Sequence, residues 1–115
     1  MFVTKKFTFS AAHFLTKYKG KCEKLHGHTY KLQVTVEGDM KDDGMVIDFL
    51  ELKKIVNERV IDKLDHSSLN DLFENPTAEL IAKWIWEQLG DISGAKLYEV
   101  KLWESSTSSV TYRGQ

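Results

Sequence analysis

The feature that most constrains the fold is a change of hydrophobic period along the chain. Apolar and polar residues alternate in two early segments, at about 2–12 and 28–37, as in strands with one buried face. From about residue 49, apolar residues recur instead at the three- and four-residue spacing of a helix that buries one side. This order predicts a sheet with one face covered by helices, which is an α+β fold.

Helix-start and helix-stop signals divide the rest of the chain. The first helix is predicted over about 49–63, after a possible cap at Asp48. The second opens in "NPTAEL" at 75–80, and Gly90 ends it. Two more strands are predicted at about 96–104 and 109–113.

The predicted order is therefore ββααββ, a four-stranded antiparallel sheet with two helices on one face. A chain of 115 residues is long enough for one domain, 1–115, and too short for two. A sheet this small has two open edges, which need to be covered, charged or paired with another subunit. Pairing would make the protein a homo-oligomer.

Composition and charge exclude several classes of partner. No run approaches the roughly 20 apolar residues of a membrane span, and the first ten residues lack the apolar core of a signal peptide. The net charge of −1 gives no general attraction to nucleic acid. We therefore expect a cytoplasmic protein with no membrane or nucleic-acid partner.

Three histidines share the predicted buried face. His13 has the parity of the apolar residues in the first strand, and His26 and His28 lie two apart at the start of the second. If the strands pair as a hairpin, the three imidazoles come from the same end of one face. A single histidine is more often a hydrogen-bonded polar residue, but three together on an apolar face are costly to bury unpaired. Three imidazoles with an open fourth position are typical of catalytic zinc, Zn²⁺.

The stretch "CEKLHGH" at 22–28 also holds the only cysteine of the chain. Cys22 is a buried small side chain, a fourth ligand that closes a structural site, or a thiolate just beyond ligand distance that can take a proton. The spacing does not decide between these interpretations.

Two further positions carry acid–base groups. Asp65 and His66 are adjacent in "LDHSSLN", where they are either a hydrogen-bonded pair or the C-terminal end of a helix. Glu104 has the inward parity of its strand, so its carboxylate either accepts from a ligand N–H pair or turns to water at the strand end.

Six segments together resemble the 6-pyruvoyl tetrahydropterin synthase family, over essentially the whole chain. They are "FSAAH", "CEKLHGH", "GMVIDF", "LDHSSLN", "NPTAEL" and "LWESSTS", in this order. The three-residue spacer between Cys22 and His26 is similar to that of the 6-carboxytetrahydropterin synthase branch, which serves queuosine (7-deazapurine) biosynthesis.

The resemblance implies the tunnelling fold, in which three sheets join into a twelve-stranded barrel and two trimers stack into a homohexamer. It implies 7,8-dihydroneopterin triphosphate as the substrate, and a role for each candidate residue. The implied zinc ligands are His13, His26 and His28; the implied base is Cys22; the implied proton relay is Asp65 with His66; and the pterin contacts are Glu104 and Thr107.

Two departures from the family pattern bear on the product. The loop "ESSTS" lacks the usual proline, and Glu23 beside Cys22 resembles the glutamate of folate-type relatives that form 6-hydroxymethyl-dihydropterin. The first interpretation is a zinc-dependent lyase that makes 6-carboxytetrahydropterin. The alternatives are a pyruvoyl-type or folate-type enzyme and, from another class, a non-catalytic zinc- or pterin-binding module.

Overall fold

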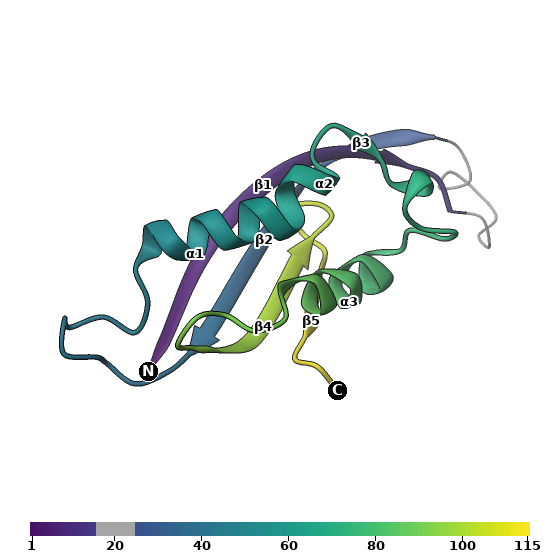
Figure 1. The fold of residues 1–115 in the computed structure, drawn as a ribbon. Helices are drawn as coiled ribbons and strands as arrows, with labels where there is room; N and C mark the ends of the chain where they lie inside the picture. The colour runs from purple at the N-terminus through teal and green to yellow at the C-terminus, as the bar shows by residue number, and fades with distance from the viewer. Residues whose placement is uncertain (16–24) are drawn as a thin grey trace.

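The computed structural model describes residues 1–15 and 25–115, which form one sheet with the helices packed against one of its faces (Figure 1). In chain order the elements are β1 (Phe2–His13), β2 (His26–Glu37), α1 (Phe49–Val56), the π-helical turn η2 (Asn57–Ile61), α2 (Asp62–Leu64), β3 (Ser67–Ser68), the 3₁₀ turn η3 (Leu69–Asp71), α3 (Ala78–Leu89), β4 (Lys96–Trp103) and β5 (Ser109–Tyr112).

The sheet has the strand order β3-β1-β2-β4-β5. The four long strands pair antiparallel, as predicted, and β3 adds a short parallel edge along Ala11 and Ala12 of β1. The predicted strand count of four was wrong by this one strand. A strand of two residues is too short to show a hydrophobic period in the sequence.

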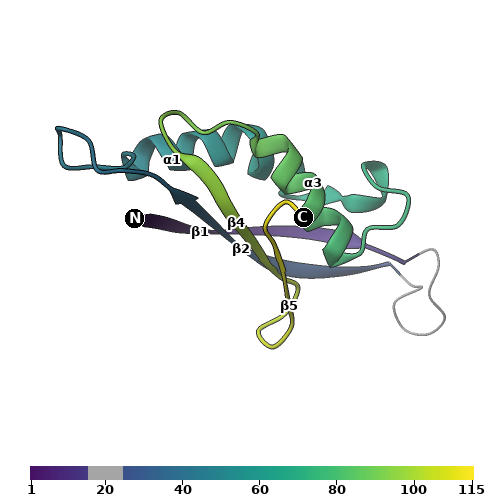
Figure 2. The ribbon, with the colours of Figure 1, turned by 90° about the horizontal axis from the view of Figure 1, so that it is seen from below.

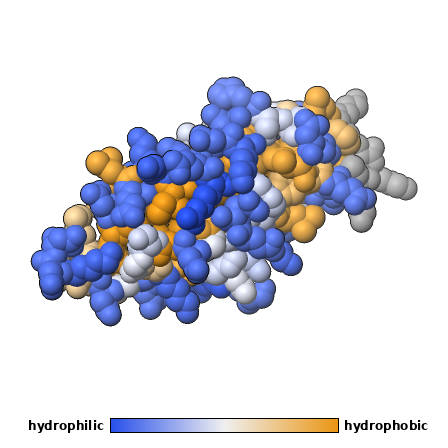
Figure 3. Space-filling model, in the orientation of Figure 1, coloured by the Kyte–Doolittle hydropathy of each residue, from blue (hydrophilic) through white to orange (hydrophobic). Residues whose placement is uncertain are grey.

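The alternation read from the sequence matches the burial in the sheet. In β2, Tyr30, Leu32 and Val34 are fully buried under the helices, and Lys31 between them is exposed on the other face. Figure 2 shows the helices on one side of the sheet and no helix on the other. In Figure 3 hydrophobic patches interrupt an otherwise mostly hydrophilic surface on the helix side.

Side-chain caps begin both long helices. Asp48 accepts a hydrogen bond from the backbone N–H of Leu50 at 2.8 Å, and Thr77 accepts one from that of Leu80 at 3.2 Å. Each bond satisfies a donor that the first helical turn leaves free. No helix in the described part of the chain is long and apolar enough to cross a membrane.

The predicted helix at 49–63 is a continuous helical segment formed by α1, η2 and α2. Its π-helical turn carries Arg59, whose guanidinium donates to the backbone carbonyls of Leu89 and Asp91. Leu89 is the last residue of α3 and Asp91 lies just beyond it, at a helix end where carbonyls lack partners of their own and a positive charge is favoured. Arg59 therefore joins the first helical segment to the C-terminal end of α3.

We expect Arg59→Ala to lower the free energy of unfolding by about 1–2 kcal/mol, because two carbonyls lose a charged donor. Urea denaturation followed by circular dichroism measures the change. Lys54→Ala, an exposed lysine of α1, is the matched control and should change stability by less than about 0.5 kcal/mol. Equal losses in the two variants would contradict the capping role.

Candidate metal centre

The β1–β2 register brings the three predicted ligand histidines together. His13 lies directly opposite His26, and His28 lies opposite Ala11 on the same face. The centroids of the three rings are 4.7 Å apart for His13 and His26, 4.9 Å for His13 and His28, and 4.6 Å for His26 and His28. One end of the sheet therefore presents three imidazoles edge to face.

Glu104 completes this cluster from the neighbouring strand. It follows β4 directly, and a backbone hydrogen bond from its N–H to the carbonyl of Ser108 closes the turn toward β5. Its Oε1 lies 3.2 Å from Nε2 of His28 and 3.8 Å from Nε2 of His13. One ligand atom from each of the four residues lies within 4.8 Å of the others. The inward orientation of this carboxylate agrees with the parity of its strand.

Burial keeps two of the imidazoles neutral. Desolvation, and then the neighbouring His28 and His26, lower the pKa of His13 to about 4. Desolvation is also the main cause of the lowered pKa of His28, where the Glu104 carboxylate opposes it. Neutral imidazoles at pH 7 each offer a lone pair, which is the form that binds a metal ion.

The cluster also contains the two buried polar side-chain atoms of residues 1–15 and 25–115 that have no hydrogen-bond partner. These atoms are Nε2 of His13 and Nε2 of His28; the 3.2 Å contact between His28 Nε2 and Glu104 Oε1 is an ion-pair distance and not a hydrogen bond. A buried polar atom without a partner costs free energy, and two of them side by side in one cluster indicate a missing partner that both can share. A metal ion bound to both nitrogens would be such a partner.

Tyr30 orients the most buried of these rings, and the sequence did not single it out. Its hydroxyl lies 2.8 Å from Nδ1 of His13, deep in the core. Desolvation, and then Glu104, raise the pKa of Tyr30, so the phenol stays protonated and neutral. When Nδ1–H donates to the phenol oxygen, the lone pair of the same ring is left on Nε2. The clue in the sequence was the inward parity that Tyr30 shares with His28.

These donors fit zinc better than the hard cations. Imidazole nitrogens with one carboxylate are common zinc ligands, whereas Ca²⁺ and Mg²⁺ select oxygen-rich sites. Glu104 is close enough to be a fourth ligand, and it is equally placed to accept from an N–H group of a molecule bound beside the metal.

Asn70 anchors the chain next to this cluster. Its side-chain oxygen accepts from the backbone N–H of Phe14 at 2.9 Å, and its side-chain nitrogen donates to the carbonyl of Phe14 at 3.0 Å. Phe14 directly follows His13, so the clamp holds the end of β1 where the most buried imidazole is attached. No pattern in the sequence predicted this contact. Cys22 and Glu23 lie outside the described residues.

Asp65 and His66 form a side-chain pair, which is one of the two arrangements that the sequence allowed. Asp65 Oδ2 lies 3.1 Å from His66 Nδ1, while Oδ1 accepts from the backbone N–H of Ser10 at 2.9 Å. The bond from Ser10 is the main cause of the lowered pKa of Asp65, followed among the lowering causes by the charge of His66. The backbone N–H of His66 in turn donates to the carbonyl of Ser10. Both residues are thus fixed to β1.

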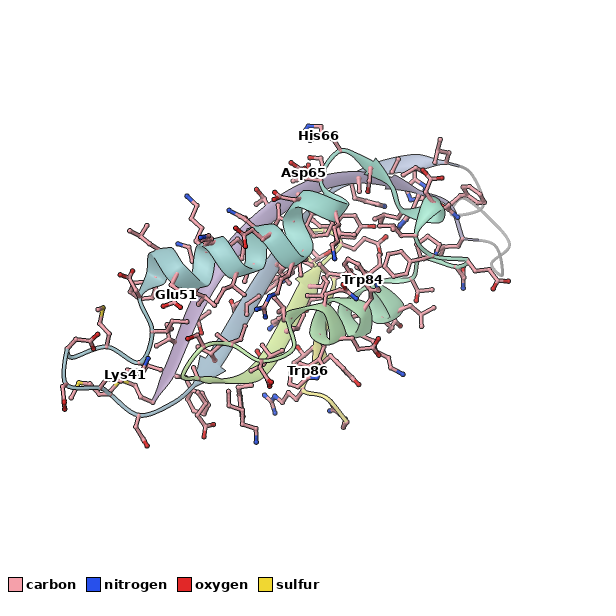
Figure 4. The ribbon with its side chains drawn as sticks, in the orientation of Figure 1. Lys41, Glu51, Asp65, His66, Trp84 and Trp86 are labelled. Carbon is pink, nitrogen blue, oxygen red and sulfur yellow. The ribbon has the colours of Figure 1, made fainter. Side chains whose placement is uncertain are left out.

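The ring of His66 points outward from the end of the helix, as Figure 4 shows. Its side chain is 84% exposed, and its φ of +59° places it in the left-handed region. His66 is not part of the group of four candidate metal ligands, but it lines an open hollow of about 470 Å³ together with His28.

Thr107 lies exposed in the β4–β5 turn, where its backbone N–H donates to Ser105 Oγ.

Comparison with known proteins places these features in one family. The sequence profile of 6-pyruvoyl tetrahydropterin synthase matches residues 2–115. The chain is 36% identical to 6-carboxy-5,6,7,8-tetrahydropterin synthase of Haemophilus influenzae, over 96% of this chain and 97% of that protein. It is 44% identical to dihydroneopterin monophosphate aldolase of Pyrococcus furiosus, over 90% and 89%.

A solved structure agrees with the sequence relatives. The 6-pyruvoyl tetrahydropterin synthase of Caenorhabditis elegans superposes with a TM-score of 0.88 at 31% identity, covering 100% of this chain and 96% of that one. The profile match, the relatives and the tunnelling fold agree. The chain belongs to the 6-pyruvoyl tetrahydropterin synthase family of pterin-processing enzymes.

Proposed function

We propose that the protein is a zinc-dependent lyase that converts 7,8-dihydroneopterin triphosphate into 6-carboxy-5,6,7,8-tetrahydropterin. The observation that carries this proposal is the pair of buried, unpartnered Nε2 atoms of His13 and His28 beside His26. The similarity to a relative of that name, over nearly the whole of both chains, supports the product. The product would serve queuosine (7-deazapurine) biosynthesis.

In this proposal His13, His26 and His28 hold the zinc ion, which when bound supplies a Lewis acid for the side-chain hydroxyls of the substrate. Tyr30 keeps the His13 ring in the orientation that leaves Nε2 as the ligand atom. Glu104, with Thr107 nearby in the turn, accepts from the N–H groups of the pterin ring.

Two groups move protons. Cys22 takes a proton from the substrate side chain as a thiolate, and His66 exchanges a second proton. Asp65 orients the His66 ring through the 3.1 Å contact to Nδ1 and is itself fixed by the N–H of Ser10. Because His66 is highly exposed on its own chain, we propose that it works where subunits meet.

A second candidate reaction is the folate-type cleavage that yields 6-hydroxymethyl-dihydropterin. Glu23 next to Cys22 and the 44% identity to an aldolase favour it. Formation of the pyruvoyl product on the same site is the other enzymatic alternative. A non-catalytic zinc- or pterin-binding module would leave the substrate unchanged, so product analysis separates it from all three.

The metal assignment predicts one zinc ion per chain. Plasma emission spectrometry of the purified protein should find this ratio, and His28→Ala should lower it well below one because a ligand is lost. Cys22→Ala and Glu104→Gln should keep the zinc, since three imidazoles are sufficient to hold it. Loss of zinc from Cys22→Ala would show instead that the thiol is a ligand and that the site is closed.

The roles of Cys22 and Glu23 predict different product changes. Cys22→Ala should lower kcat for the carboxylated product about 10²- to 10⁴-fold, as expected for loss of a general base, with zinc retained. Glu23→Ala should spare that product and abolish any 6-hydroxymethyl-dihydropterin. Chromatography of reaction mixtures with dihydroneopterin triphosphate measures both. If each variant lost both products equally, the division of roles would be wrong.

The exposed edges of the sheet predict assembly. The outer edge of β1 is paired by β3 only at Ala11 and Ala12, and β5 forms the opposite edge. We expect a homohexamer, a dimer of trimers, with a mass near six times 13.3 kDa. Light scattering after size-exclusion chromatography gives this mass, and a monomer at micromolar concentration would contradict the expectation.

A further inference from the structure

The face of the sheet without helices carries an ordered set of polar side chains. Strand register aligns them in two adjacent rows across β1, β2, β4 and β5. Figure 2 shows that no helix covers this face. The first row is Thr8, Lys31, Trp103 and Ser109, and the second is Lys6, Gln33, Lys101 and Thr111.

These rows concentrate positive charge in a chain whose net charge is −1. They hold three lysines and no carboxylate, and their other members are hydroxyls, one amide and one indole. The acid in the next row, Glu99, already pairs with Arg113 at 2.9 and 3.0 Å. Within the described part of the chain, neither row therefore contains a carboxylate that could pair with Lys6, Lys31 or Lys101.

The rows also enclose a hollow. Its volume is about 440 Å³, within the range of small-molecule sites. Lys6 and Lys31 line it with the hydroxyls of Thr8 and Ser106, and the partly exposed ring of Trp103 forms one wall. Lys101 Nζ lies 4.9 Å from the centre of that ring, a cation–π distance that keeps its ammonium group over Trp103.

We propose that this hollow binds an oligophosphate anion. Condensed phosphates place several negative charges within a few ångströms, which suits the two lysines that line the hollow and a third lysine in the adjoining row better than a single carboxylate does. Lysine is a common phosphate ligand, and the hydroxyls of Thr8 and Ser106 add donors. An aromatic ring attached to the phosphates would stack on the face of Trp103 that the Lys101 ammonium group does not cover. The site is separate from the metal centre, because the clustered histidines lie on the opposite face of the sheet.

Inorganic triphosphate is the probe, measured by isothermal titration calorimetry on the assembled protein. The test variant is Lys6→Gln/Lys31→Gln/Lys101→Gln. The control variant, Lys53→Gln/Lys54→Gln/Lys83→Gln, removes the same charge from exposed helical positions. The control should bind like the unmodified chain, and the test variant should bind at least tenfold more weakly. Equal weakening, or no binding by the unmodified chain at millimolar probe, overturns the proposal.

Two further measurements distinguish this site from alternatives. A variant with all three lysines changed to arginine keeps the charge and should restore most of the affinity, which shows that the glutamine variant did not simply misfold. His28→Ala should bind triphosphate normally even if it loses metal. If His28→Ala lost triphosphate binding while the lysine-to-glutamine variant kept it, the anion would bind at the metal centre and not in this hollow. A nucleoside triphosphate that binds more tightly than the inorganic probe, through Trp103, identifies a ring-bearing ligand; equal affinity identifies the free anion.

Discussion

The register between β1 and β2 is the constraint on which the site depends. Each strand has twelve residues, and they pair along their full length from Phe2 opposite Glu37 to His13 opposite His26. A slip of one residue would turn every side chain to the other face and separate the histidines from the core. The apolar residues of both strands fix the register by packing under the helices. The metal centre is therefore aligned by the same burial that stabilises the fold.

Without a bound metal ion, the histidine cluster also lowers the stability of the fold. Buried imidazoles with depressed pKa values and unpartnered nitrogens are unfavourable in an apolar layer, although the hydrogen bond between Tyr30 and His13 offsets part of this cost. The surrounding core compensates, since Leu32, Val34 and Leu102 are completely buried nearby in the same sheet. A bound metal ion would convert this cost into stabilisation, because it binds the folded arrangement and not the separated residues.

Local patterns in the sequence predicted the four long strands, both helices and the convergence of His13, His26 and His28. Parity and capping are properties of neighbouring residues, so they are visible without the fold. The sequence could not predict β3, the hydrogen bond between Tyr30 and His13, or the hydrogen bond from the backbone N–H of Ser10 to Asp65. Each of them depends on residues far apart in the chain. The roles of Cys22 and Glu23 stay predictions, since the described structure does not include them.

The clamp between Asn70 and Phe14 has a consequence for how this region can vary. A carboxamide carries a donor and an acceptor in one plane, as a peptide group does, so Asn70 stands in for a neighbouring strand at the end of β1. Both of these hydrogen bonds go to the main chain of residue 14. Substitution at position 14 should thus be tolerated by the clamp, whereas aspartate at position 70 lacks the donor and leucine lacks both groups. Across homologous chains, position 70 should be the restricted member of this pair.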